Sequence, residues 1–183
     1  MERLPTRLHG PILLAPPVHG DARGFFTESY RVDHWTAEGV DAAFVQDNHS
    51  RSARGVVRGM HVTLGPGQAK LVRCARGKIW DVVVDVRTAS PTYGEWEGFE
   101  LSDENMHQLY VPIGFGHGFA VLSDVADVLY KQSNYYSGAV ERGFALDDPE
   151  VAIDWTIPPT DRTISERDRT APPLAGVAAT LPF

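Results

Sequence analysis

Hydrophobic and polar residues alternate along most of the chain in short runs that are separated by Gly, Pro, Asp, Asn and Ser. Such a period of two is typical of β-strands with two different faces. Segment 77–87, GKIWDVVVDVR, has the clearest alternation, with Trp80, Val82, Val84 and Val86 on one face and Asp81, Asp85 and Arg87 on the other. We therefore predict a strand over 77–87.

Eight further runs predict strands in the same way: GFFTESY, AFVQDNHS, GVVRGMHV, QAKLVRCA, EWEGFEL, HQLYVP, HGFAVLS and VADVLYKQS. Turns are expected at GPG, SPTYG, SDEN and IGFG. Regularly spaced short strands favour an all-β antiparallel sandwich, jelly roll or barrel. The best helix candidate is short, from Asp33 as N-cap to Gly39 as C-terminal stop.

The length of 183 residues fits one domain over 1–183, because no linker, repeat or low-complexity segment interrupts the chain. The Pro- and Ala-rich tail after Pro158 is expected to wrap the surface. The apolar run at 12–15 is too short for the core of a signal peptide, and no segment resembles a membrane span. We expect a cytoplasmic protein without a membrane partner.

The charge and cysteine content narrow the classes of partner. A formal net charge of −7 and a pI near 5.4 argue against a general nucleic-acid binder. The only cysteine, Cys74, excludes an internal disulfide and a zinc site of several thiolates, and its apolar surroundings predict a buried side chain.

Positive charge is nevertheless concentrated in one stretch. It contains Arg51, Arg54, Arg58, Lys70, Arg73 and Arg76. In an acidic protein such a cluster indicates a phosphate-sized partner, and a solvated strand face is the alternative.

Within this stretch, RGVVRGMHVTLGPGQAK, His61 is the residue most suited to chemistry. No second histidine or glutamate follows it in His-x-His fashion, which disfavours a metal site. The choice between a buried core histidine and a catalytic base stays open from the residues alone. Strict alternation puts Arg58 and His61 on opposite faces, so both could serve one site only at a bulge or strand end.

Other candidate groups lie farther along the chain. His117 stands between glycines in GFGHGF, which permit close approach of a ligand. Tyr130, Tyr135 and Tyr136 could act as a general acid, stack on a base or simply be half-buried. Asp168 could orient a histidine if the tail folds back.

Taken in order, these and neighbouring blocks resemble one known family. The blocks are DARGFFTESY, VQDNHSRS, GVVRGMH, QAKLVR, DVVVDVRTASPTYGEW, VPIGFGHGFAVLS, LYKQSNYY, ERGFALDDPEVAIDW and ISERDRTAP, from about residue 8 to residue 175. They resemble the dTDP-4-dehydrorhamnose 3,5-epimerase family. This resemblance implies a cupin-type jelly-roll homodimer that needs neither metal nor nucleotide cofactor and inverts C3 and C5 of dTDP-4-dehydro-6-deoxy-D-glucose.

The resemblance also implies roles for individual residues. The catalytic set would be His61 as general base, Asp168 as its orienting partner, Tyr130 as general acid and Lys70 beside the C4 oxygen. The substrate contacts would be Arg23, Glu28, Gln46, Asp47, Asn48, Arg58, His117, Tyr136, Glu141 and Arg167.

Three positions in two blocks depart from the family pattern. The family usually continues RGLHYQ, where this chain has Val62 and Thr63, and its SEKD block has a lysine where this chain has Arg167. Relatives that invert only one carbon also vary after the histidine. A C3-only or C5-only epimerase is therefore the alternative, followed by a non-catalytic sugar-nucleotide-binding cupin and a metal-dependent cupin enzyme.

Overall fold

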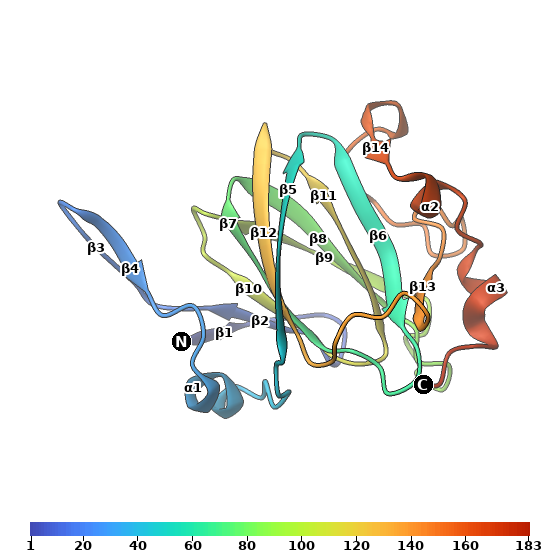
Figure 1. Ribbon diagram of the computed structural model, residues 1–183, viewed down its shortest axis with the longest axis horizontal. Coiled ribbons are helices and arrows are strands. Elements are labelled where there is room, and N and C mark those ends of the chain that lie inside the picture. Colours follow the sequence, from blue (N-terminus) through green and yellow to red (C-terminus); the bar gives the residue numbers. More distant parts are fainter.

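Two antiparallel sheets pack face to face into a jelly-roll barrel in the computed structural model, which describes residues 1–183 (Figure 1). In spatial order, sheet 1 contains β1 (Glu2–Leu4), β2 (Ile12–Ala15), β10 (Gln108–Val111), β7 (Lys70–Arg76), β12 (Val125–Gln132) and β5 (Gln46–Ala53). Sheet 2 contains β13 (Glu141–Gly143), β6 (Val56–Thr63), β11 (Phe115–Val121), β8 (Lys78–Asp85) and β9 (Trp96–Ser102). The predicted all-β jelly roll is confirmed.

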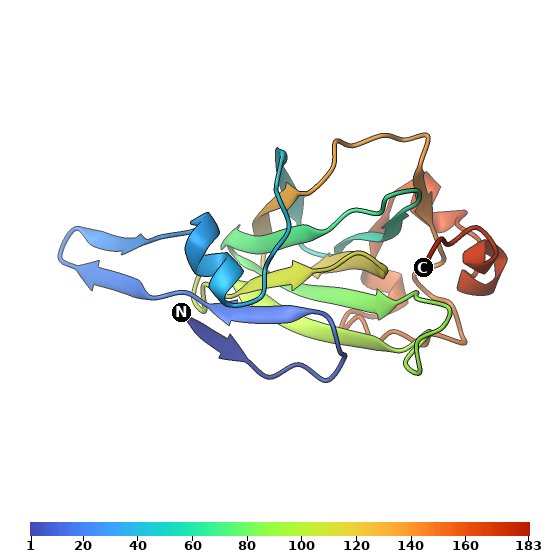
Figure 2. The same cartoon turned by 90° about the horizontal axis from the view of Figure 1, so that it is seen from below.

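Smaller elements surround this barrel. A hairpin of β3 (Val18–Asp21) and β4 (Gly24–Thr27) projects away from it as an arm (Figures 1 and 2). The helical elements are α1 (Val32–Ala37), a 3₁₀ turn (Pro159–Asp161), α2 (Glu166–Arg169) and α3 (Leu174–Ala178). A short strand after the turn, β14 (Thr163–Ile164), pairs in parallel with β6. None of these helices is long and apolar enough to cross a membrane.

Both faces of sheet 2 are buried, by different partners. On β8, Ile79 and Val83 point into the barrel, whereas Val82 and Val84 point outward. The outward side chains pack under the C-terminal region, which supplies Phe144, Leu146, Val151, Trp155, Leu174, Val177 and Leu181. The tail therefore contributes core residues as well as covering the surface.

Sheet 1 is covered on its outer face at one end only. There Trp35 of α1 and Val40 pack on Ile12, Leu14 and other apolar side chains of the sheet. Toward the β5 edge, outward side chains such as His49 and Arg51 are exposed. Inside the barrel, Val72, Cys74 and Val128 of sheet 1 face the apolar side chains of sheet 2.

Several local expectations need correction. Helix α1 begins after Arg31 as N-cap, and Asp33 lies in its first turn, where its carboxylate accepts hydrogen bonds from the Arg31 guanidinium. Gly39 does end this helix region, with a φ of 95°. The turn expected at IGFG is shorter than predicted, because Phe115 already belongs to β11.

Candidate active site

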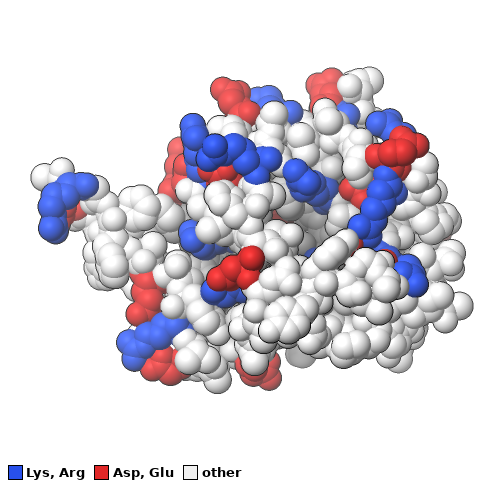
Figure 3. Space-filling model, in the orientation of Figure 1, with Lys and Arg blue, Asp and Glu red and all other residues white.

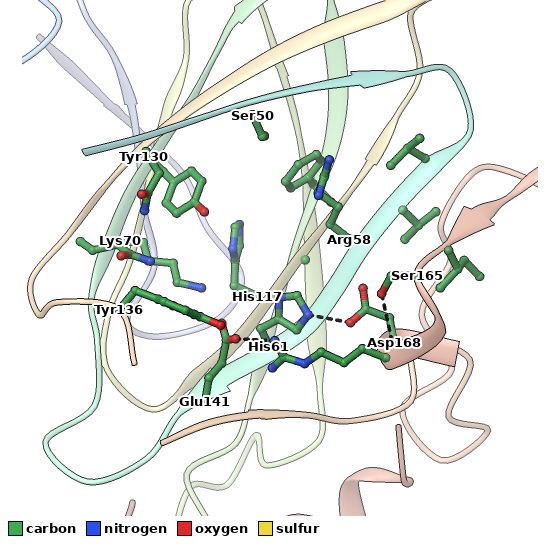
Figure 4. A pocket seen from close by; sticks show the side chains of 18 of the residues that line it. Ser50, Arg58, His61, Lys70, His117, Tyr130, Tyr136, Glu141, Ser165 and Asp168 are labelled. Carbon is green, nitrogen blue, oxygen red and sulfur yellow. Dashed lines mark hydrogen bonds and ion pairs between the residues drawn. The ribbon is translucent and has the colours of Figure 1, made fainter. Parts of the chain in front are cut away.

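A cavity of about 720 Å³ opens between the two sheets at one end of the barrel. Its wall combines strand residues of both sheets with the segment around α2 (Figure 4). It is lined by most of the predicted site residues: Gln46, Asn48, Arg58, His61, Lys70, His117, Tyr130, Tyr136, Glu141, Arg167 and Asp168. Residues that are up to 122 positions apart in sequence, Gln46 and Asp168, thus share one cavity.

The centre of the site is a histidine–carboxylate pair. His61 Nε2 lies 2.7 Å from Asp168 Oδ1. Burial opposes ionisation of Asp168, but the hydrogen bond and charge of His61 outweigh it, so the pKa of Asp168 is lowered. An ionised Asp168 accepts a hydrogen bond from His61 Nε2–H, which leaves His61 Nδ1 with a free lone pair that can accept a proton.

The tail positions Asp168 through a helix cap. Ser165 is the N-cap of α2, and its Oγ accepts a hydrogen bond of 3.1 Å from the Asp168 backbone N–H. Asp168 is only 6% exposed. The cap was not foreseen from the sequence, although a Ser three residues before an Asp at a helix start is a capping signal.

A bulge in β6 puts Arg58 and His61 on the same face of the sheet. His117 of β11 pairs with His61, and Phe119 pairs with Arg58, so three steps along β6 match two along β11. The extra residue returns Arg58 to the face of His61, and both line the cavity. Strict alternation would have separated them.

A second histidine–carboxylate pair lies deeper. His117 Nε2 is 2.9 Å from Asp81 Oδ1, and Asp81 is fully buried. Burial lowers the pKa of His117, although the charge and hydrogen bond of Asp81 act in the opposite direction. His117 is therefore neutral near pH 7, donates from Nε2 to Asp81 and offers Nδ1 as an acceptor.

Lys70 and Tyr130 come from neighbouring strands of sheet 1 and point into the same space (Figure 4). Burial lowers the pKa of Lys70, against the opposing charges of Glu141 and Asp81. Burial, reinforced by Glu141, raises the pKa of Tyr130 and keeps its hydroxyl protonated. The cavity thus holds a proton acceptor on sheet 2 and a proton donor on sheet 1.

Hydrogen bonds also order the rim. Arg167 Nη1 donates to Glu141 Oε2 at 2.7 Å, and this bond raises the pKa of Arg167. The backbone N–H of Tyr136 donates to Gln46 Oε1 at 2.9 Å. Gln46 Nε2 in turn donates to Asn48 Oδ1. Tyr136 is 54% exposed and lies at the cavity mouth.

Two cations in the cavity have no carboxylate within 4 Å. The Arg58 guanidinium donates to Ser52 Oγ at 3.0 and 3.1 Å, and Lys70 has no ion pair. Unpaired positive charge in a cavity favours an anionic ligand. Across the visible surface, by contrast, basic and acidic side chains are interspersed (Figure 3).

The basic cluster seen in the sequence is therefore divided in space. Arg51 pairs with Asp127 on the outer face of sheet 1, and Arg54 pairs with Asp124 in a loop. Only Arg58 and Lys70 of that cluster line the cavity, where Arg167 of the tail joins them. The basic residues of that stretch do not share one face, because successive strand residues face opposite sides.

Three expected substrate contacts lie elsewhere. Asp47 alternates with Gln46 and Asn48, so it points to the outer face, where it pairs with Lys131 Nζ at 2.8 Å. Arg23 is on the arm and pairs with Asp21, and Glu28 pairs with His34 just after the arm. None of them lines the cavity of their own chain.

Other lining residues were not predicted. They include Ser50, Gln132, Thr163 and Ser165. Ser50 and Gln132 follow the inward alternation of β5 and β12, which is the sequence signal that could have found them. Thr163 and Ser165 depend on where the tail folds, which alternation does not reveal.

Two of the three departures from the family pattern, Val62 and Thr63, lie outside the cavity wall, whereas Arg167 lines it. Val62 is buried in the outer core of sheet 2, beside Phe144 and Trp155. Thr63 Oγ1 bonds to Gln68 Oε1 at 3.5 Å and does not line the cavity. No cluster of three or more His, Cys, Asp or Glu side chains has an arrangement suited to a metal ion.

Comparison with known proteins decides the family. The family model for dTDP-4-dehydrorhamnose 3,5-epimerase matches residues 5–176. A dTDP-4-dehydrorhamnose 3,5-epimerase of Pseudomonas aeruginosa is 49% identical over 167 residues, which are 90% of this chain and 92% of that protein. The chain belongs to the dTDP-4-dehydrorhamnose 3,5-epimerase family. The predicted resemblance is confirmed, and the protein is an epimerase.

Two further relatives bear on this epimerase. The crystal structure of dTDP-6-deoxy-D-glucose-3,5-epimerase from Legionella pneumophila, in complex with dTDP-4-keto-L-rhamnose, has a TM-score of 0.95 and 40% identity. The match covers 99% of this chain and 97% of that one. A dTDP-4-dehydrorhamnose 3-epimerase of Streptomyces niveus is 45% identical over 177 residues, which are 96% of this chain and 84% of that protein.

Proposed function

We propose that the epimerase inverts C3 and C5 of dTDP-4-dehydro-6-deoxy-D-glucose, giving dTDP-4-dehydro-β-L-rhamnose. One observation carries this proposal. His61 and Tyr130 project into the cavity from opposite sheets, so a sugar ring between them has a base on one face and an acid on the other. Inversion needs this arrangement, because the proton must return to the face opposite the one it left.

Each inversion proceeds through an enolate. His61 Nδ1 takes the proton from a carbon next to the C4 ketone, and the electron pair of that C–H bond forms a C=C bond as the carbonyl π pair moves to oxygen. The Tyr130 hydroxyl then delivers a proton to the opposite face of the same carbon, and the ketone re-forms. Solvent removes the proton from His61 and reprotonates Tyr130, so the cycle balances.

The remaining groups stabilise charge. Lys70 has no ion pair. This supports a position of its ammonium against the C4 oxygen, where negative charge develops. Arg58, which likewise lacks a carboxylate partner, suits the diphosphate. The remaining proposed substrate contacts are His117, Gln46, Asn48, Tyr136, Glu141 and Arg167.

Deuterium exchange tests the reaction. The wild-type chain is incubated with dTDP-4-dehydro-6-deoxy-D-glucose in D₂O, and the C3 and C5 proton signals are followed by NMR. We expect both signals to disappear and the product configuration to be inverted at both carbons. Retention of both protons contradicts the proposal.

Two variants, one at His61 and one at Tyr130, distinguish the role of the base from that of the acid. Tyr130→Phe keeps His61, so it should still exchange protons but lose inversion. His61→Ala should lose exchange and inversion together. Full turnover by His61→Ala would rule out this mechanism. No turnover by the wild-type chain would instead favour a protein that uses the cavity for binding alone.

A C3-only epimerase is the second candidate, since the Streptomyces niveus 3-epimerase is almost as similar to this chain as the 3,5-epimerases. Its signature in the same experiment is exchange and inversion at C3 with the C5 proton retained.

We also propose that the epimerase works as a homodimer whose arm reaches the partner's cavity. Phe25 and Phe26 on the arm are 62% and 70% exposed, an unusual environment for two adjacent large apolar side chains. Arg23 and Glu28, expected to contact substrate, lie outside the cavity of their own chain. Insertion of the arm into a second copy would cover the phenylalanines and bring these charges to a cavity.

Mixed dimers test this arrangement. His61→Ala chains and Arg23→Ala/Glu28→Ala chains, each impaired alone, are unfolded together and refolded as a mixture. Turnover that neither has alone is expected, because one cavity of each mixed dimer then has both a wild-type His61 and a wild-type arm. A monomeric mass in solution, or no recovery of turnover, contradicts the proposal.

A further inference from the structure

A polar row crosses the inner face of sheet 1 at the cavity end. Gln132 of β12 pairs in register with Gln46 of β5 on one side and with Lys70 of β7 on the other. Directly opposed side chains in antiparallel strands have Cβ atoms about 4.5–5.5 Å apart. All three residues line the cavity, so Gln132 lies between Gln46 and Lys70 and shares their face.

Gln132 is the member of this row whose amide is not used. It is 4% exposed, and its Oε1 is buried without a hydrogen-bond partner. Gln46, in contrast, uses both ends of its amide, accepting from the Tyr136 N–H and donating to Asn48. A buried hydrogen-bond acceptor without a donor is costly. The unused carbonyl of Gln132 in a binding cavity therefore indicates that a donor contacts it when the site is at work.

Lys70 is the corresponding unused donor. The chain has three lysines, and the other two are ion-paired: Lys78 with Glu100 at 3.0 Å and Lys131 with Asp47 at 2.8 Å. Lys70 is 9% exposed and has no carboxylate within 4 Å. As the register partner of Gln132, Lys70 has a side chain long enough to reach the Gln132 carbonyl.

We propose that Gln132 is a positioning residue: its Oε1 accepts a hydrogen bond from the Lys70 ammonium and directs this cation toward the ketone oxygen of the bound sugar. The inference rests on the proposed function, in which Lys70 stabilises the enolate. A neutral acceptor at this place orients a buried cation without neutralising it. A carboxylate there would reduce the net charge available to the enolate.

The charged surroundings of Lys70 leave room for this role. Asp81 on β8 and Glu141 on β13 favour its ionised form, and burial opposes it. His61 on β6, His117 on β11, and Tyr130 beside Gln132 on β12 also line the cavity around it, as does Arg58 on β6. None of these groups hydrogen-bonds or ion-pairs with Lys70, so an acceptor at Gln132 adds a direct contact that the site otherwise lacks.

Two substitutions of similar length test the contact by turnover. Gln132→Met removes the acceptor, and we expect kcat to fall by about tenfold, as for loss of a hydrogen bond to a charged group, with little change in KM. The alkaline limb of the kcat profile should move to lower pH in Gln132→Met and to higher pH in Gln132→Glu. Shifts in the same direction, or none, overturn the inference.

A titration that needs no turnover separates this inference from the reaction itself. In chains labelled with ¹³C-lysine, the Cε signals of three lysines are followed against pH by NMR, with and without saturating dTDP. The Lys70 midpoint should fall in Gln132→Met and rise in Gln132→Glu, while Lys78 and Lys131 serve as internal controls. An unchanged Lys70 midpoint in both variants overturns the inference, even if the wild-type chain performs the proposed epimerisation.

A double-mutant cycle completes the test. If Gln132 acts through Lys70, then Gln132→Met should cost at most about twofold in deuterium exchange when Lys70 is already Met, because the two effects share one interaction. An undiminished loss in the Lys70→Met background would show that Gln132 acts by another route.

Discussion

The two histidine–aspartate pairs of the cavity have the same chemistry but different surroundings. His61 and His117 are register partners on β6 and β11. The side chains of His61 and Asp168 are 24% and 6% exposed, whereas those of His117 and Asp81 are 8% and 0% exposed. We therefore expect the more exposed His61 to exchange a proton in each cycle and the enclosed His117 to keep its own.

The origin of each carboxylate differs as well. Asp81 lies on β8, whose neighbours β11 and β9 hold it in the barrel wall. Asp168 comes from a four-residue helix in the tail, held by the Ser165 cap and by packing of the tail on sheet 2. The enclosed pair suits fixed hydrogen bonding to a ligand, and the more open pair suits proton transfer.

Replacing each histidine by asparagine should produce the largest difference between the two pairs. In His61→Asn the proposed base is lost, and kcat should fall by about 10²–10⁴-fold. In His117→Asn a proposed acceptor for substrate is lost, and we expect a rise in KM with a smaller loss of kcat. Steady-state kinetics on the two purified variants measures both values, and equal losses of kcat would mean that His117 also transfers protons.

Replacing each aspartate by asparagine should give a smaller difference between the two pairs. The amide of Asp168→Asn can donate to His61 Nε2, which moves the ring proton to Nδ1, the nitrogen assigned as base. Such a tautomer error costs up to about 10⁴-fold in a serine protease triad, and we expect at least about 10²-fold here. Asp81→Asn should keep most of kcat but lower the Tm, since it disturbs a fully buried hydrogen bond. Thermal unfolding together with kinetics distinguishes these outcomes.

Lys70→Met should lower kcat by about 10²–10³-fold and yet stabilise the fold. The pKa of Lys70 is lowered in the folded chain, so between its folded and unfolded pKa values the unfolded state binds more protons. The lysine therefore destabilises the fold at neutral pH, and this penalty fades as pH rises toward the unfolded value. We expect the variant's Tm to rise at pH 7, by about 2–4 °C per kcal/mol for a chain of this size, and the gain to shrink near pH 10. A Tm below wild type at pH 7 would contradict this.

The smallest effect concerns acid stability. Because the pKa of His117 is lowered by burial, the unfolded chain takes up a proton at this residue before the folded chain does as pH falls. Stability contributed by the neutral form is full above about pH 6.5 and is lost below it. The Tm of the wild type should therefore drop more between pH 7.5 and 5.5 than that of His117→Gln, as measured by circular dichroism. Parallel drops would place the acid sensitivity elsewhere.

Local patterns anticipated much of the barrel. The strand predicted over 77–87 is observed as β8, Lys78–Asp85, and its two faces divide as the alternation indicates. Cys74 is buried as predicted, which raises its pKa to about 11 and leaves it a thiol. The Asp33 cap was misplaced because the helix begins earlier, directly after Arg31, so Asp33 lies in its first turn.

Strand content, family and the chemical groups of the site follow from the amino-acid sequence alone, because side-chain period, composition and motif order are local properties of the chain. How these groups meet depends on the folded arrangement of distant segments. The β6 bulge that puts Arg58 beside His61 exists only against β11, and Asp168 reaches His61 only because the tail packs on sheet 2. Facing and burial depend on which distant segment covers a strand, and a period of two carries no information about that partner.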